Sequence, residues 1–425
     1  MNDLAAKSAK KGEAWPMVRL GDVCELKNGY TPKVSEFEDK GSIPYFRISA
    51  MNLEGNEKFM REATAWLPND KRTFPSGSII FPKNGGAVFT RKVRVLERES
   101  VVDLNTGVCS PKIEMAQDYL YLWFKSFDIK NVVADGTIPF VDFSLLRNVC
   151  IPLPPLEVQK EIVEWLGKEL GECERITENF RKIAELAEAE FKAELDEVFG
   201  ELEGKCVREG EGKGEGEGEG DILTQRSREA EVRRVRLGDL GEIKRGKGIK
   251  RSETVLKGLP CVRYGEIYTS YNYVLDEPKS FISAELFDNC VHINQDDLVF
   301  TLTGENREEI AKTLAYLGKD IIAAGGDMAV WTNHGCVAMY LAYLMYSSQM
   351  IKAKAEASNG QIIVHASVKK LEEIQIPLPS LSVQESVVAK LEEARGRCDK
   401  LKVAAERGLR VAENLRKAIL AEAFE

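Results

Sequence analysis

The chain has 425 residues, a formal net charge of −9 and a hydrophobic content of 44%. This length predicts two or three domains with substantial cores, and the composition is that of an ordinary globular protein. The longest nearly apolar run, residues 337–346, is too short to cross a bilayer, which argues against a membrane protein.

Other residue counts exclude further classes. The N-terminal segment, residues 1–16, lacks the apolar stretch of a secretory signal. Nine cysteines without a CxxC pair predict reduced thiols and a cytoplasmic location. The three histidines form no recognisable metal-ligand pattern, so no metal site is expected.

The acidic charge is concentrated in one segment. Residues 157–203 carry 15 acidic and 6 basic side chains, a net charge of −9 that equals the charge of the whole chain. The remainder is therefore neutral in sum. A neutral domain can still carry a basic face, so the total charge does not exclude a nucleic-acid partner.

Two stretches of the chain predict α+β domains. In residues 17–155, β-like runs at 43–48, 78–81, 92–96 and 149–153 are separated by Gly, Pro and Asn, and a helix is expected over 118–127. The segment Val18-Arg-Leu-Gly-Asp22 predicts the start of a first strand. Residues 222–380 have the same character, with a helix over 338–357.

Each α+β stretch is followed by a long helix, over residues 156–203 and 381–425. Apolar and small residues at alternating three- and four-residue spacing predict a coiled-coil seam between these helices within one chain. An independent oligomerising coil is the alternative. Residues 204–221 predict a flexible Gly/Glu linker, and the absence of a preceding strand argues against a nucleotide-binding loop. The seam is expected to contain Leu166, Cys173, Ile176, Phe180, Ile183, Leu391, Cys398, Leu401, Ala405 and Leu415.

A nine-residue motif shows that the chain repeats itself. The sequence IPLPPLEVQ, at residues 151–159, returns as IPLPSLSVQ at residues 376–384, with seven of nine letters identical. Val18-Arg-Leu-Gly-Asp22 likewise returns as Val235-Arg-Leu-Gly-Asp239. One repetition at about half the length predicts two versions of one module.

No complete catalytic motif is visible. Glu25-Leu-Lys27 and Glu242-Ile-Lys244 match only the last part of a metal-dependent nuclease motif, and their nearest upstream acids are three residues away. Phosphate-binding, serine-hydrolase and zinc-protease motifs are absent. The sequence therefore favours a non-catalytic protein.

The loops after corresponding strands contain residue types that bind DNA. Glycine allows close backbone approach, lysine and arginine neutralise phosphates, and arginine, asparagine or threonine contact base edges. Ordinary solvated loops are the alternative interpretation. The predicted DNA-binding residues are Lys27, Asn28, Tyr30, Thr31, Lys33, Lys83, Asn84, Arg91 and Lys92 in the first half, and Lys244, Arg245, Lys247, Lys250, Arg251, Thr303, Asn306 and Arg307 in the second.

The doubled motif, with a long helix after each copy, resembles the specificity subunits of type I restriction-modification systems from about residue 17 to the end. The resemblance implies an internal pseudo-two-fold repeat. Two target recognition domains, each binding half of a bipartite duplex DNA site, would be separated by an antiparallel coiled coil that docks two modification subunits. Two restriction subunits would complete the enzyme. This chain would bind no cofactor, and S-adenosylmethionine, ATP and magnesium are expected on the partner subunits.

Two alternatives stay open at this point. The first is a specificity subunit of a type II-like or nuclease-fused restriction-modification system, in which the catalytic partner is one large polypeptide. The second is a coiled-coil scaffold that binds no nucleic acid. The acidic first helix permits the scaffold, whereas the paired basic loops favour a DNA-binding protein.

Overall fold

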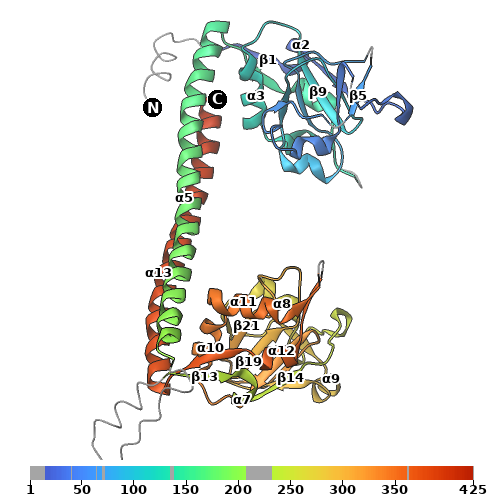
Figure 1. Ribbon diagram of the computed structural model, residues 1–425. Coiled ribbons are helices and arrows are strands. Elements are labelled where there is room, and N and C mark those ends of the chain that lie inside the picture. Colours follow the sequence, from blue (N-terminus) through green and yellow to red (C-terminus); the bar gives the residue numbers. More distant parts are fainter. Residues whose placement is uncertain are drawn as a thin grey trace, which may run out of the picture. The chain divides into compact units, whose positions relative to one another are not determined.

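The computed structural model describes residues 15–39, 41–63, 65–68, 72–134, 138–206, 232–360 and 363–424. Nearly all of the predicted N-terminal segment and most of the predicted Gly/Glu linker lie outside these residues. The fold divides into a first unit, residues 1–181 with 406–425, and a second unit, residues 182–405 (Figure 1). Each unit has hydrophobic clusters of its own.

The first unit begins with a strand interrupted by one helical turn. β1 (Met17–Arg19) is followed by α2 (Leu20–Val23) and β2 (Cys24–Asn28). The predicted start of a first strand is confirmed at Val18 and Arg19, but the strand gives way to α2 at Leu20. The turn brings Leu20 and Val23, three residues apart, into the core together. β1 pairs antiparallel with β12 (Cys150–Pro152), which is part of the repeated motif.

Two main sheets form most of the globular part of the first unit, besides the two-stranded pairs β1-β12 and β10-β11. The larger has the order β2-β9-β6-β7-β4, and the smaller has the order β5-β3-β8. The segment predicted as a strand over 43–48 is a strand only to Phe46, because η2 begins at Ile48. The bounds are β3 (Ile43–Phe46), β4 (Phe59–Met60), β5 (Ala65–Leu67), β6 (Ile79–Pro82), β7 (Arg94–Leu96), β8 (Val101–Val102), β9 (Thr106–Pro111), β10 (Val133–Ala134), β11 (Phe140–Val141), α3 (Gln117–Ser126) and α4 (Phe143–Asn148), with 3-10 turns η1 (Val34–Glu36), η2 (Ile48–Asn52), η3 (Gly86–Thr90) and η4 (Ile129–Val132).

The second unit repeats the five-strand arrangement of the larger sheet and varies the smaller sheets, with β20-β25-β24 in place of the two-stranded β10-β11. Its larger sheet has the order β14-β23-β19-β21-β16, and its second sheet, β17-β15-β22-β18, adds one strand. The bounds are β13 (Arg233–Arg236), α7 (Leu237–Leu240), β14 (Glu242–Arg245), η5 (Arg251–Glu253), β15 (Leu259–Val262), α8 (Tyr264–Ser270), β16 (Val274–Leu275), β17 (Ser280–Ile282), α9 (Ala284–Asp288), β18 (Val291–Ile293), β19 (Leu298–Thr301), β20 (Thr303–Gly304), β21 (Thr313–Tyr316), β22 (Ile322–Ala324), β23 (Met328–Thr332), α10 (Ala338–Leu344), α11 (Ser348–Glu356), β24 (Ser358–Asn359), β25 (Val364–Ala366), α12 (Val368–Glu372) and β26 (Gln375–Leu378). The predicted α+β fold and internal repeat are confirmed.

The helix predicted over 338–357 is instead two helices, α10 and α11. The break falls at Ser347, whose hydroxyl accepts a hydrogen bond from the Met350 N–H at 3.3 Å. Serine is a favoured N-cap because its side chain satisfies a free N–H of the new helix. The hydrophobic pattern continues across the break, which explains why the sequence predicts one helix.

Two long helices, α5 (Leu156–Gly204) and α13 (Leu381–Glu422), contribute to both units. In the second unit, ion pairs cross between them, from Arg397 to Glu194 at 2.8 Å and from Lys402 to Glu188 at 2.5 Å. The later residue on one helix thus faces the earlier residue on the other, so the helices are antiparallel. The predicted intramolecular pair is confirmed.

The seam between these helices is narrower than the sequence predicts. In the first unit, the Phe180 ring lies so close to Gly408 that a Cβ there would be 2.3 Å from it. Buried residues recur on α13 every seventh position, from Leu391 through Cys398, Ala405 and Ala412 to Ile419. The predicted seam residues Ile183, Leu401 and Leu415 keep 39–43% of their surface exposed and lie at its margin. Leu166 and Cys173 are buried, and Ile176 is half-buried.

The repeated motif joins each globular part to its long helix. In the first unit, the buried Gln159 carboxamide accepts a hydrogen bond from the Ala116 N–H at 3.0 Å and donates to the Pro154 carbonyl at 2.9 Å. Ala116 is the N-cap residue of α3. The Tyr119 hydroxyl donates to the Pro152 carbonyl at 2.8 Å. The motif therefore ties α3, the strand β12 and the start of α5 together.

The second copy makes the same contacts. Gln384 accepts from the Val337 N–H at 2.9 Å and donates to the Pro379 carbonyl at 2.9 Å. Val337 is the N-cap residue of α10, and the Tyr340 hydroxyl donates to the Pro377 carbonyl at 2.7 Å. The shared letters of the motif thus encode one joint, used twice. Among the described residues, no helix has the combined length and apolarity that a bilayer crossing needs.

Candidate nucleic-acid interface

In the first unit, the loops after β2 and β6 meet at one turn. This turn, residues 103–106, connects β8 to β9. The Gly29 N–H donates to the Thr106 carbonyl at 3.0 Å, and the Lys83 N–H donates to the Asn105 carbonyl at 2.8 Å. β9 pairs with both β2 and β6, so these two strands end side by side, at what we call the loop edge of the larger sheet. This edge contains the predicted residues Lys27, Asn28, Lys83 and Asn84.

The second unit has the equivalent edge. The Gly246 N–H donates to the Met328 carbonyl at 2.9 Å, and the Leu302 N–H donates to the Asp327 carbonyl at 2.7 Å. Residues 325–327 form the turn between β22 and β23 and correspond to residues 103–106. This edge collects Lys244 and Arg245 from β14 and Thr303 from β20.

The glycines at these edges serve the protein's own backbone. A Cβ on Gly29 would lie 2.1 Å from the Asp103 carbonyl oxygen, and a Cβ on Gly246 would lie 2.1 Å from that of Gly325. A side chain does not fit at either position. These two glycines are thus explained by the turn that they contact.

Three predicted residues of the first unit follow β2 in a loop. Tyr30 is half-buried, with the Arg72 guanidinium 4.6 Å from its ring centroid. The Thr31 hydroxyl accepts from the Leu104 N–H at 3.4 Å, next to the turn. Lys33 precedes η1, and its backbone N–H donates to the Glu36 carboxylate at 2.8 Å. The Lys33 side chain is exposed.

Arg91 and Lys92 contact other parts of the first unit. The Arg91 guanidinium donates to the Phe127 carbonyl, at the end of α3, at 3.4 Å. The Lys92 ammonium donates to Asn52, at the end of η2. Arg91 and Lys92 follow η3 and not the end of β6. Their hydrogen bonds therefore go to other parts of the unit and not to the turn at 103–106. Placing them with the other DNA-binding candidates is not supported by these contacts.

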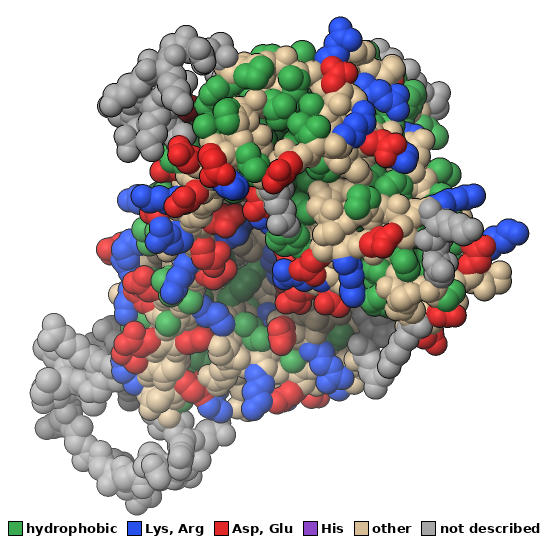
Figure 2. Space-filling model, turned by 90° about the horizontal axis from the view of Figure 1, so that it is seen from above, with side chains coloured by type: hydrophobic (Ala, Val, Ile, Leu, Met, Phe, Trp, Pro, Cys, Tyr) green, Lys and Arg blue, Asp and Glu red, His purple; other side chains and the backbone are tan. Residues whose placement is uncertain are grey.

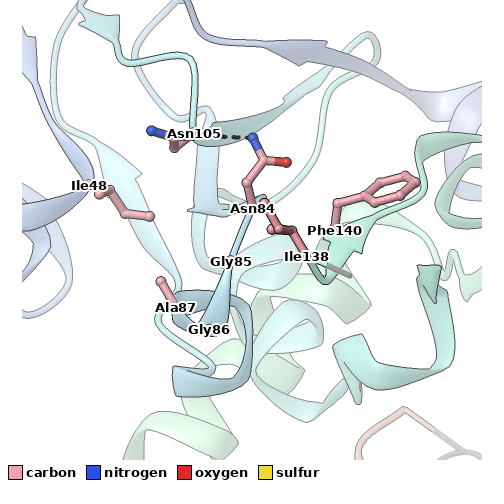
Figure 3. A pocket seen from close by; sticks show the side chains of 8 residues that line it. All are labelled: Ile48, Asn84, Gly85, Gly86, Ala87, Asn105, Ile138 and Phe140. Atoms are coloured by element: carbon pink, nitrogen blue, oxygen red, sulfur yellow. Dashed lines mark hydrogen bonds between the residues drawn. The ribbon is translucent and has the colours of Figure 1, made fainter. Parts of the chain in front are cut away.

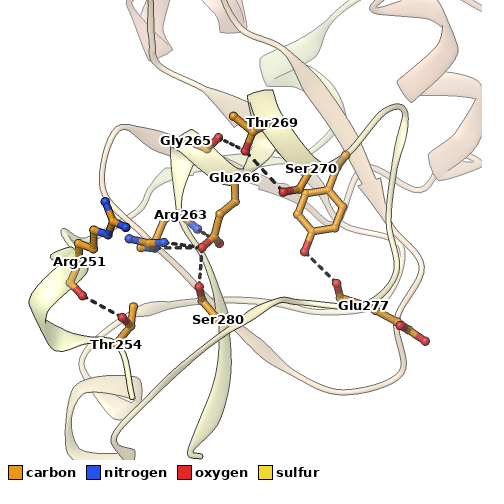
Figure 4. A network of polar contacts seen from close by, with 10 residues as sticks. Arg251, Thr254, Arg263, Gly265, Glu266, Thr269, Ser270, Glu277 and Ser280 are labelled. Atoms are coloured by element: carbon orange, nitrogen blue, oxygen red, sulfur yellow. Dashed lines mark hydrogen bonds and ion pairs between the residues drawn. The ribbon is translucent and has the colours of Figure 1, made fainter. Parts of the chain in front are cut away.

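The basic loop of the second unit contains both paired and unpaired cations. Lys244 lies 2.5 Å from Glu242, and Arg245 lies 3.8 Å from Asp327. Within the described ranges, Lys247, Lys250 and Arg251 form no ion pair and are exposed. In Figure 4, the Arg251 guanidinium has no drawn partner, whereas the neighbouring Arg263 is bound to Glu266 at 2.7 Å. The three unpaired cations are the ones free to meet an anion.

The remaining predicted residues of the second unit form hydrogen bonds within that unit. The Asn306 side-chain oxygen, Oδ1, accepts a hydrogen bond from the Glu309 N–H at 2.8 Å. The Arg307 guanidinium donates to the Gly360 carbonyl at 3.3 Å. Thr303 reaches across to β25, where its hydroxyl lies 3.2 Å from the His365 Nδ1. These contacts shape the loop and place Thr303 beside a histidine that the sequence did not single out.

An open hollow of about 600 Å³ lies beside the turn of the first unit (Figure 3). Besides Asn84, it exposes side chains that the sequence analysis missed, namely Asn105 in the turn and Ile138 and Phe140 from the β11 region. An isolated β-bridge between Asn84 and Phe140 brings these distant segments together. The turn-like sequence Asp-Leu-Asn-Thr-Gly at 103–107 was a usable signal for Asn105. The hollow is lined by Ile48, Asn84, Gly85, Gly86, Ala87, Asn105, Ile138 and Phe140.

The incomplete nuclease motif has no metal-binding geometry. Glu25 and Glu242 lie 2.9 Å and 2.5 Å from the lysines two positions later, Lys27 and Lys244. In the part of the chain that the structure describes, no group of three His, Cys, Asp or Glu side chains could hold a metal ion. On the face shown in Figure 2, acidic and basic side chains are interspersed.

Comparison with known proteins gives a consistent result. The family model described as "Type I restriction modification DNA specificity domain" matches residues 12–187 and 229–402. The "Type I restriction enzyme MjaVIII specificity subunit" of Methanocaldococcus jannaschii is 24% identical over 397 residues, covering 89% of this chain and 85% of that protein. The MjaIX specificity subunit of the same organism is 25% identical over 169 residues, covering 36% and 37%.

The fold also matches a solved structure. A chain from a study titled "Structural basis underlying complex assembly and conformational transition of the type I R-M system" superposes with a TM-score of 0.68. It is 21% identical, and the match covers 96% of this chain and 97% of that one. At this level of identity the likeness concerns the fold.

Proposed function

The chain belongs to the family of type I restriction-modification DNA specificity domains, and we propose that it is the specificity subunit of such an enzyme, with each globular domain binding one half of a bipartite duplex site. The two family matches cover both globular halves. This assignment is favoured over the nuclease-fused system and over a scaffold without DNA. The chain itself carries no reaction in this proposal.

One observation supports the division of labour most directly. The same sheet edge occurs in both units, but its side chains differ. Asn84 and Asn105 stand there in the first unit, and Thr303 and His365 stand there in the second. Amide, hydroxyl and imidazole groups offer different donors and acceptors. One scaffold with two different surfaces is what reading two different half-sites requires.

The long helices have a separate role in this proposal. They hold the two domains at a fixed spacing and dock two modification subunits, to which two restriction subunits add. Exposed apolar side chains on the helices, including Leu186, Val403 and Val411, support a docking surface. S-adenosylmethionine, ATP and magnesium belong to the partner subunits.

Methylation mapping tests the proposal. The chain is expressed with its modification subunits in a host that lacks both, and the methylated bases of the host genome are mapped. We expect one motif made of two defined half-sites separated by a fixed number of unspecified bases. Expression of the modification subunits alone is the control and should give no such motif. Absence of a split motif in the complete sample would refute the proposal.

A further inference from the structure

The hollow beside the turn at 103–106 has a composition that selects among base pairs. Resting on the proposed function, we propose that the first domain uses this hollow to read an A·T pair from the major groove. The Asn84 and Asn105 carboxamides bind the adenine, and Ile138 and Phe140 contact the methyl group of the thymine.

The polar side of the hollow consists of two carboxamides. The Asn84 Nδ2 donates to the Asn105 Oδ1 at 3.3 Å (Figure 3). This leaves the Asn84 Oδ1 as an acceptor and the Asn105 Nδ2 as a donor. The major-groove edge of adenine offers one donor, N6–H, and one acceptor, N7, so it complements this pair. Guanine offers two acceptors and would leave the Asn84 oxygen facing another oxygen.

The other side of the hollow is apolar. Ile138 is 65% exposed and Phe140 is 41% exposed, so both offer apolar surface to a ligand in the hollow. Thymine alone among the bases carries a methyl group in the major groove. Contact with that methyl would cover part of this apolar surface, so the two sides of the hollow match the two bases of one pair.

The lining argues against a phosphate ligand. None of its residues is charged. The predicted cation Lys83, which precedes Asn84 in the chain, has its ammonium group 5.3 Å from the centroid of the Phe143 ring. Phosphates are bound chiefly through arginine and lysine, and guanine is most often read by the same residues. A neutral amide pair is suited to a base edge instead.

The walls of the hollow are fixed before any DNA binds. The buried Asp103 carboxylate accepts hydrogen bonds from the Ile48 N–H at 2.9 Å and the Asn105 N–H at 3.0 Å, so it ties two sides together. The Gly85 N–H donates to the Pro139 carbonyl at 2.8 Å, which holds the third side. A preformed site loses less entropy on binding and discriminates more sharply.

The test uses the full chain with its modification subunits. Selection from a random duplex pool defines both half-sites, and the half-site whose base preference is unchanged by Thr303→Ala is assigned to the first domain. We expect it to contain an A·T pair whose change to G·C weakens binding by roughly tenfold or more. Asn84→Ala and Asn105→Ala each remove this preference and leave the other half-site unaffected. Asn148→Ala, an exposed asparagine on α4, is the matched control.

Modified bases test each contact with the wild-type protein, so the result does not depend on how a variant folds. Replacing the adenine by 7-deazaadenine removes N7, and replacing the thymine by uracil removes only the methyl group. We expect both duplexes to bind several-fold more weakly to the wild type. Asn105→Ala, which lacks the donor to N7, should no longer respond to the first change, and Phe140→Ala should no longer respond to the second.

The outcomes separate this inference from the proposed function. If wild-type protein selects a split site but neither modified base weakens binding, the hollow does not read an A·T pair. The same conclusion follows if both asparagine variants keep the wild-type base preference. If wild-type protein selects no sequence at all, the proposed function fails as well.

Discussion

Lys354 is a buried lysine at the base of a candidate DNA-binding loop. Its ammonium group donates to the Ala311 carbonyl at 3.0 Å and lies 5.7 Å from the centroid of the Tyr346 ring. Among the described residues, no carboxylate forms an ion pair with it. Burial, with a smaller contribution from Lys192, lowers the pKa of Lys354 to about 7. Ala311 has a left-handed backbone, with a φ of 52°, at the end of the loop that contains Asn306.

This pKa predicts that stability rises with pH. Between pH 7 and pH 10 the unfolded chain holds a proton on Lys354 that the folded chain has lost, so the free energy of unfolding increases with pH. One such proton gives a slope of at most about 1.4 kcal/mol per pH unit. We expect Lys354→Met to remove this rise. Urea titrations at pH 7, 8 and 9 measure it, and Lys352→Met, an exposed neighbour, is the control. Equal slopes in wild type and Lys354→Met would contradict the prediction.

Individual residues were only partly predictable. Residue type suggested Lys27, Asn84 and Thr303, and the structure places Lys27 in β2, Asn84 just after β6 and Thr303 in β20. Their binding to DNA stays a prediction. Asn105 and His365 were missed because strand pairing, which a single sequence does not specify, brings them to their partners. His365 lies 62 residues after Thr303 in the chain, and the pairing of β20 with β25 brings the two side chains together. Arg91 and Lys92 were suggested in the same way but contact Phe127 and Asn52 in another part of the domain, and their binding to DNA stays a prediction.

Elements were predicted better because periodicity and capping are local properties. The seven-residue spacing on α13 indicates its buried row without structural information. The sequence did not show that two helices replace the one expected over 338–357, because the hydrophobic pattern continues through the Ser347 cap. Nor did it show that α2 interrupts the first strand. Short helical turns of four residues are below the length at which periodicity is informative.

The joint encoded by the repeated motif should contribute strongly to stability. Gln384→Leu removes the acceptor of the Val337 N–H and the donor to the Pro379 carbonyl, both inside the protein. Leaving one buried polar group unpaired costs about 1–3 kcal/mol. We therefore expect the free energy of unfolding of the second unit to fall by roughly 2–4 kcal/mol.

Fluorescence of the buried Trp331, in the same unit, can follow the unfolding of this variant in urea. Ser382→Ala is the matched control, because Ser382 occupies a motif position at which the two copies differ and its side chain is exposed. It should change stability by less than about 0.5 kcal/mol. A Gln384→Leu protein as stable as this control would show that the joint depends on apolar packing alone.

At the scale of the whole molecule, the net charge of −9 has little bearing on DNA binding. The 15 acidic residues of segment 157–203 belong to one helix, whereas Lys247, Lys250 and Arg251, which are exposed and form no ion pair among the described residues, lie in one loop of the second unit. Local placement therefore decides where a polyanion can bind. Duplication was evident from the repeated motif, but the pairing state of each cation required the structure.

Binding of duplex DNA should weaken with salt in proportion to the phosphates contacted. Each contact contributes a slope of about −0.9 to a plot of log affinity against log salt. We expect Lys247→Ala with Arg251→Ala to reduce the slope by up to about 2, because both cations are exposed and unpaired. Affinity should fall for duplexes that carry the half-site of the second domain, whatever their other half. The matched control is Lys369→Ala with Lys370→Ala. These two exposed lysines lie on α12, which packs against α7, and α7 is at the start of β14 whereas the basic loop is at its end. An unchanged slope in the Lys247/Arg251 variant would remove this loop from the DNA interface.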